Sequence, residues 1–167
     1  HSSDIIAFDF LKTSIKPDST ALLFPLNSVH LADGANTFFD NKLGVIGANN
    51  PAWANYWAGV RNNDMGVVSL FKTPVTISSV GLHYMVEEET GIYPPMEVEV
   101  WGSENEKKAK LLVKMKPELP KKGEKPSLKL IESYFRSAEV SYLKVIAKPY
   151  QKKNDRYLLL VDEMLFN

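Results

Sequence analysis

Apolar and polar residues alternate at a spacing of two in many short runs of this chain, and helical periodicity is poor throughout. In the run MEVEV, residues 96–100, three apolar side chains alternate with two glutamates. Successive side chains of a strand point to opposite faces of a sheet, so this run predicts a strand with one buried face and one wet face. Gly, Pro, Asn and Asp separate most of these runs, which is typical of strands joined by turns.

Roughly eight to ten strands follow from this pattern, a number typical of a β-sandwich. The runs span residues 5–11, 20–24, 66–71, 75–86, 96–100, 111–115, 128–131, 141–147 and 156–166. Residues 32–63 and 87–95 read as loop regions, and residues 103–129 as a solvated hairpin and loop because acids and bases alternate there. We therefore expect an all-β fold, an antiparallel β-sandwich or jelly roll.

Composition indicates one domain over residues 1–167, in which residues 1–3 resemble a cloning remnant. The 20 basic and 20 acidic residues give a net charge of zero, which argues against a nucleic-acid partner. No apolar run is long enough to span a bilayer, so membrane insertion is not expected. The absence of Cys excludes disulfides, cysteine zinc sites and thiol nucleophiles.

An acidic pair, Asp162-Glu163, interrupts the apolar C-terminal strand. Period-two spacing predicts that Glu163 shares a face with Tyr157, Leu159, Val161 and Leu165. A carboxylate on an apolar face is unfavourable by several kcal/mol unless a partner compensates it. The residues leave that partner open: a metal ion, an arginine, backbone N–H groups, or a salt bridge at the strand end.

The order of several segments resembles a known family. These are LADG (31–34), a Trp-Gly-type segment, ISSVGLHYMV (77–86), PPMEVEVWGS (94–103), YLKVIAK (142–148) and LLLVDEMLF (158–166). Together they look like a galactose-binding-like β-sandwich of the discoidin or coagulation-factor type C group, which includes many carbohydrate-binding modules. The resemblance covers residues 20–166 and extends to accessory domains of bacterial surface glycosidases. It implies a glycan or polysaccharide ligand, neighbouring domains in a parent protein, and a secreted, periplasmic or cell-surface location.

The resemblance also implies a structural calcium ion between an early loop and the last strand. The matching ligands are Asp33 and Glu163, with Asn36 and Thr37 as loop partners. Calcium takes six to eight oxygen ligands, which carboxylates and carbonyl groups supply. The loop ANTFF that follows Gly34 departs from the family's usual T-x-W pattern.

For a sugar site, the resemblance directs attention to the aromatic and Asn-rich segment 49–64, since sugars stack on aromatic faces. The candidate ligand-binding residues are Trp53, Tyr56, Arg61 and Asn62, with Tyr93 from the loop 87–95 and His30 beside the Asp33 loop. We expect Trp57 and Trp101 to pack in the core, and His83 to be a surface or hydrogen-bonded histidine.

Two other classes of function are an enzyme and a structural or protein-interaction domain. A glycosidase needs two carboxylates across a cleft, but the consecutive glutamates at 87–89 are typical of a solvated loop. The sequence also has no GxSxG, HExxH or P-loop motif. The sequence therefore predicts a non-catalytic domain. The alternative is a structural or protein-interaction domain, in which Trp53, Tyr56 and Trp57 are core or interface residues.

Overall fold

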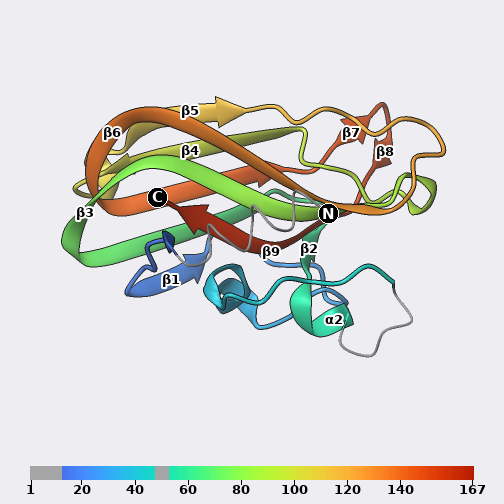
Figure 1. Cartoon of the computed structure of the whole chain (residues 1–167), viewed down its shortest axis with the longest axis horizontal. Helices are drawn as coiled ribbons and strands as arrows, with labels where there is room; N and C mark the ends of the chain where they lie inside the picture. The colour runs from blue at the N-terminus through green and yellow to red at the C-terminus, as the bar shows by residue number, and fades with distance from the viewer. Residues whose placement is uncertain (1–12, 48–52) are drawn as a thin grey trace.

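The computed structural model describes residues 13–47 and 53–167, and it confirms a mostly antiparallel β fold (Figure 1). The predicted strand at 5–11 lies outside the described residues. The strands are β1 (Ser19–Leu22), β2 (Ala58–Val60), β3 (Met65–Val86), β4 (Glu97–Ser103), β5 (Lys110–Met115), β6 (Ser127–Lys148), β7 (Gln151–Lys152), β8 (Asp155–Arg156) and β9 (Leu159–Phe166). Short helical turns are η1 (Gly34–Phe39), α2 (Trp53–Tyr56), η2 (Glu88–Thr90) and η3 (Glu106–Lys108). No helix among the described residues is long and apolar enough to cross a membrane.

Two strands of 22 residues, β3 and β6, run through both layers of the sandwich. The sequence predicts each of them as two separate strands, so the bounds of these strands are corrected, while the nine strands of the described residues agree with the expected eight to ten. Register shifts lie between Leu70 and Val75 and between Ile77 and Ser79, where β3 bends and continues with β6 beside it. Pro74 falls at the first shift, a place where its missing N–H does not interrupt the ladder.

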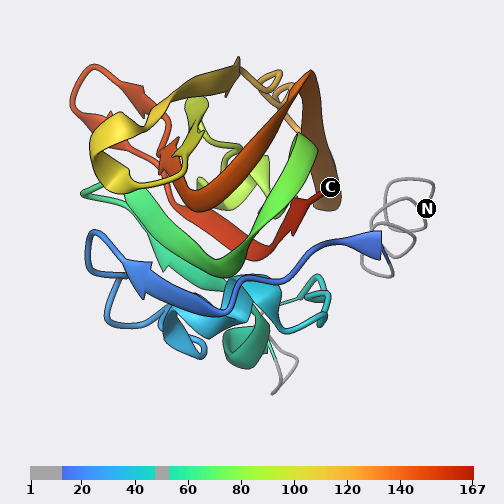
Figure 2. The same cartoon turned by 90° about the vertical axis from the view of Figure 1, so that its left-hand side faces the viewer.

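Strand pairing defines the two layers. In one layer, the first part of β3 pairs with β1 and with the second part of β6, and β4 and β5 follow. In the other layer, β9 pairs with β2 on one side and with the second part of β3 on the other, and the first part of β6 follows. Figure 2 shows the long strands curving from one layer into the other.

The main core lies between these layers and contains only apolar or aromatic side chains among its buried members. Alternate residues of β3 supply Val80, Leu82, Tyr84 and Val86, and β4 supplies Val98 and Val100. Burial of such side chains contributes about 1.5–3 kcal/mol each, so this core supplies most of the driving force for folding. The period-two pattern of the sequence predicts these faces correctly.

A second apolar cluster lies on the outer side of β9 and β3, where Trp53 and Tyr56 of α2 pack against it. Figures 1 and 2 show α2 beside this side of the sheet. Its buried members are Trp57, Met85, Ile92, Leu158 and Leu160. Gly44 lies against the Trp57 indole so closely that a Cβ atom at this position would collide with the ring. The Trp57 indole N–H donates to the Val45 carbonyl at 3.0 Å, which fixes this loop on the sheet.

A β-bulge at Asp162 breaks the alternation of β9. His83 is paired with Glu163 and Tyr84 with Val161, so Asp162 is the extra residue. As a result Leu159 and Val161 before the bulge, and Met164 and Phe166 after it, all belong to the main core. The prediction that Glu163 shares a face with Leu159 and Val161 is therefore wrong, because the extra residue reverses the facing of every side chain beyond it.

Candidate functional site

Asp162 and His83 form a buried hydrogen-bonded pair on the outer face of the sheet. The His83 Nδ1 atom lies 2.7 and 2.9 Å from the two carboxylate oxygens of Asp162, and both side chains are fully buried. The Gly44 N–H donates to the same carboxylate at 2.5 Å, and the Trp57 ring stacks on the imidazole at 6.4 Å between centroids. Burial raises the pKa of Asp162, while the hydrogen bond from His83 opposes that shift. His83 is thus the hydrogen-bonded histidine that the sequence predicts.

Glu163 is buried beside a second carboxyl group and a lysine. The Lys42 N–H lies 3.3 Å from Glu163 Oε1 and also donates to Asp40 at 2.9 Å. The Lys16 Nζ atom lies 3.8 Å from Glu163 Oε2, and both atoms are buried without a hydrogen bond among the described residues. The partners of Glu163 are therefore a backbone N–H group and a lysine in a salt bridge, and both kinds of partner are among the alternatives that the sequence leaves open. The identity of the lysine, Lys16, is not predicted from the sequence.

Glu163 is a buried carboxyl group that keeps its proton near neutral pH. Burial raises the pKa of Glu163 to about 10, and a hydrogen bond with Asp40 acts in the same direction, against the opposing effect of Lys16. Burial also lowers the pKa of Lys16, against the opposing effect of Glu163. The group therefore limits its buried charge by protonation of Glu163.

The residues around Glu163 do not fit the predicted calcium site as they are arranged. Asp33 and Asn36 are exposed, whereas Glu163 is buried. The Oγ1 atom of Thr37 accepts a hydrogen bond from the Asp33 N–H at 2.8 Å, and no cluster of three or more His, Cys, Asp or Glu among the described residues is suited to a metal. A doubly charged ion would have to displace both the proton of Glu163 and Lys16. Calcium binding at this place stays a prediction.

The predicted sugar-binding residues fall into two groups. Trp53 and Tyr56, on α2, pack against the second cluster, and His30 meets Trp53 edge-on at 5.8 Å between ring centroids. Trp57 is fully buried, as predicted for a core residue. Trp101 is half-buried, with the Lys144 Nζ atom 5.3 Å from its ring centroid.

The other group lies at the loop end of the sandwich, where three tyrosines stack. Tyr93 lies 5.3 Å from Tyr150 and 4.2 Å from Tyr157 between ring centroids, and the planes of Tyr93 and Tyr150 differ by 19°. Each of the three is only partly buried. Backbone hydrogen bonds hold them together: the Tyr93 N–H donates to the Leu158 carbonyl at 3.0 Å, and the Tyr157 N–H to the Tyr150 carbonyl at 3.1 Å.

Tyr150 also lines a groove of about 120 Å³ together with the predicted residues Arg61 and Asn62. The groove lies between the β2–β3 turn and the β6–β9 connection. Arg156 and Gln151 of the β6–β9 connection also line it. Asn63 turns its amide away, donating to the Pro25 and Asp64 carbonyls at 2.9 and 3.0 Å. Aromatic and fork-shaped polar groups therefore converge on one surface.

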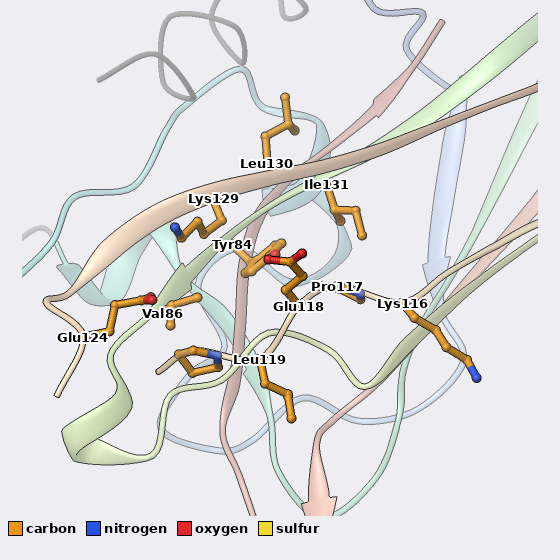
Figure 3. Close-up of a pocket in the computed structure, with 11 residues that line it drawn as sticks. Tyr84, Val86, Lys116, Pro117, Glu118, Leu119, Glu124, Lys129, Leu130 and Ile131 are labelled. Atoms are coloured by element: carbon orange, nitrogen blue, oxygen red, sulfur yellow. The ribbon is translucent and has the colours of Figure 1, made fainter. Parts of the chain in front are cut away.

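Two larger pockets lie elsewhere. One, of about 360 Å³, lies between the loop 116–124 and strands β3 and β6, and Figure 3 shows its lining, which includes Tyr84 and Leu119. Another, of about 710 Å³, lies between the β4–β5 turn and the bend of β6. Neither pocket contains a sequence-predicted site residue, and neither contains stacked aromatic rings.

Sequence reasoning missed Lys16 and Asp40 around Glu163, Tyr150 and Arg156 at the groove, and Tyr157 beside Tyr93 and Tyr150. The signal for Tyr150 and Tyr157 was present, since both flank the Lys-rich turn that the sequence places between two strands. No local signal pairs Lys16 with Glu163, because 147 positions separate them along the chain and the contact depends on the bulge.

Comparison with solved structures identifies the fold class as the β-sandwich of carbohydrate-binding modules. A family 32 module of AlyQ, solved with 4,5-unsaturated mannuronic acid, matches 92% of this chain and 97% of its own at 7% identity, with a TM-score of 0.53. The chitosan-binding module 1 of a chitosanase/glucanase from Paenibacillus sp. IK-5 matches 91% and 96% at 9% identity, with a TM-score of 0.53.

The third family 32 module of a family 31 glycoside hydrolase from Clostridium perfringens matches 93% of this chain and 94% of its own at 9% identity, with a TM-score of 0.57. No protein-family model matches the sequence, and no curated protein matches it either. At these identities the likeness concerns the fold.

Proposed function

We propose that this chain is a non-catalytic carbohydrate-binding module that holds a glycan at the loop end of the sandwich. The observation that carries the proposal is the partly exposed stack of Tyr93, Tyr150 and Tyr157 beside the groove of Arg61 and Asn62. Aromatic faces pack against the C–H surfaces of sugar rings, while guanidinium and amide groups bind hydroxyl groups. The groove is small and shallow, so we expect weak binding per site.

The surroundings of the acidic loop support a binding role over a hydrolytic one. Glu87 accepts a hydrogen bond from the Thr90 hydroxyl group, and Glu88 accepts one from the Gly123 N–H at 2.6 Å. These contacts give both acids a part in holding loops together, and they do not arrange two carboxylates across a cleft.

An accessory position in a larger secreted, periplasmic or cell-surface protein is part of the proposal. Two of the similar modules come from larger carbohydrate-active enzymes, a chitosanase/glucanase and a family 31 glycoside hydrolase. The partners of this chain would then be a glycan or polysaccharide and the neighbouring domains of its parent protein.

A glycan array of the isolated domain, followed by titration with any sugar that binds, tests the proposal. Tyr93→Ala and Tyr150→Ala should each weaken binding about tenfold, equivalent to 1.4 kcal/mol. Tyr134→Ala is the matched control, because Tyr134 is 66% exposed on β6 and outside the stack. Circular dichroism verifies that each variant folds.

A structural or protein-interaction role is the second candidate, and the packing of Trp53, Tyr56 and Trp57 on the second cluster favours it. A blank array at high protein concentration would reject the sugar-binding proposal in favour of this one.

A further inference from the structure

The groove lined by Arg61, Tyr150 and Arg156 carries two guanidinium groups that form no salt bridge with the acidic residues the structure describes. Its other charged lining residues are Asp64 and Lys148, and Lys148 is paired with Glu97 and Glu99. We propose that this groove selects a negatively charged sugar, one that bears a carboxylate or a sulfate ester. The inference rests on the proposed function and adds the class of ligand to it.

The two arginines are the free charges of this group. Lys148 is held by Glu97 at 3.3 Å and by Glu99 at 3.7 Å. The guanidinium groups of Arg61 and Arg156, by contrast, form no salt bridge and no side-chain hydrogen bond with any residue in the ranges 13–47 and 53–167, and both residues are exposed. A ligand anion would therefore not have to displace an existing partner to reach them.

Arginine is suited to this task because its planar fork donates two parallel hydrogen bonds to a carboxylate or a sulfate group. The adjacent Tyr150 ring offers an apolar face to the sugar ring, and the Asn62 and Gln151 amides lie on the same groove for hydroxyl groups. Charge, stacking surface and neutral polar groups thus meet within one small groove, as a single acidic sugar residue requires.

The two larger pockets lack this combination. The pocket beside the loop 116–124 has two lysines and two glutamates in its lining, a net charge of zero. The pocket at the bend of β6 is lined by Lys108, Lys110 and Arg136 against Glu104 and Glu139, a net charge of +1, and its Lys108 is paired with Glu104 at 2.6 Å. Of the three pockets, the groove is the one that joins unpaired guanidinium groups to an aromatic stack.

Isothermal titration of the folded domain with three oligosaccharides of equal length tests the inference: an oligogalacturonate, a sulfated galactan oligosaccharide without carboxylates (carrageenan type) and a neutral galacto-oligosaccharide. We expect at least one acidic probe to bind about tenfold more tightly than the neutral one, since charge-assisted hydrogen bonds are stronger than neutral ones. Added salt should weaken this preference because the groove is open to solvent. The two acidic probes distinguish a carboxylate ligand from a sulfate ester.

Arg61→Ala and Arg156→Ala should each remove most of the preference for the acidic probe, and Arg61→Lys should restore only part of it. Lys152→Ala is the matched control, since Lys152 is an exposed cation of the same hairpin that does not line the groove. The inference would be overturned if the neutral probe bound as tightly as the acidic probes or more tightly, and if both arginine variants left this binding unchanged. The proposed function would then still stand. Failure of all three probes and of a broad glycan array would overturn both.

Discussion

The two faces of β9 show two ways in which one strand is stabilised. Its inner face contributes Leu159, Val161, Met164 and Phe166 to the apolar core between the layers. Its outer face carries Asp162 and Glu163, which are as fully buried as the core residues but are surrounded by His83, Lys16, Asp40 and backbone N–H groups. The inner face tolerates changes of shape by repacking, whereas the outer face depends on each polar partner being present.

Removal of the histidine of the Asp162 pair should have the largest effect. His83→Ala leaves the buried Asp162 carboxyl group without the histidine side chain that contacts both of its oxygens, for which we expect a loss of about 3–5 kcal/mol in the free energy of unfolding. Urea denaturation measures it. A double-mutant cycle with Asp162→Asn separates the pair from its surroundings, and the double variant should lose much less than the sum of the two single changes. A loss below about 1 kcal/mol in His83→Ala would mean that the pair contributes little.

The pH dependence of stability should distinguish Glu163 from the core. The pKa of Glu163 is raised to about 10 from a usual value of 4.5, so between these values the folded protein binds more protons than the unfolded chain. Stability is then highest at the acid end of this window and falls as pH rises, by at most about 1.4 kcal/mol per pH unit for one group.

Glu163→Gln removes this titration, so the stability of the variant relative to the natural chain should increase steadily from pH 5 to pH 9, roughly the window of the shifted group. Denaturant unfolding at several pH values measures the trend. Glu139→Gln, at an exposed acid of β6, is the control. A constant difference between Glu163→Gln and the natural chain would show that Glu163 is ionised in the folded state throughout.

How far the sequence predicts the structure differs between these two faces. Alternation identifies the inner faces of β3, β4 and the first part of β9, because a period of two is a local property of each strand. The bulge at Asp162 has no local signature, and it decides where both acids point. The predicted ligand residues also depend on contacts between distant parts of the chain. Arg61, Asn62 and Tyr93 lie near Tyr150. Trp53 and Tyr56 pack elsewhere, because the pairing of β2 with β9 places α2 on the second cluster.

A substitution of Lys16 tests whether Lys16 or a calcium ion is the cation beside Glu163. Lys16→Met keeps most of the side-chain stem but removes the ammonium group, and we expect a loss of about 1–2 kcal/mol. Thermal unfolding in EDTA and in excess Ca²⁺ should give the same melting temperature for the natural chain, because Glu163 keeps its proton near neutral pH and Lys16 already lies beside it. A clear rise with Ca²⁺ that Glu163→Gln abolishes would contradict the role given to Lys16 and support the calcium prediction.

The smallest effect is expected for Asp33→Ala in the early loop, and Thr37→Val, at the other residue of the same hydrogen bond, is its comparison. Asp33 contributes its backbone N–H to Thr37 Oγ1, and its exposed side chain makes no capping hydrogen bond to η1. Asp33→Ala should therefore change the free energy of unfolding by less than about 0.5 kcal/mol. Thr37→Val removes the buried acceptor and should be unfavourable by about 1–3 kcal/mol. If calcium bound through the Asp33 carboxylate, Asp33→Ala would lower the melting temperature more than Thr37→Val in excess Ca²⁺. If each variant instead shows the same change in melting temperature with and without the ion, Thr37 is the residue that holds this loop.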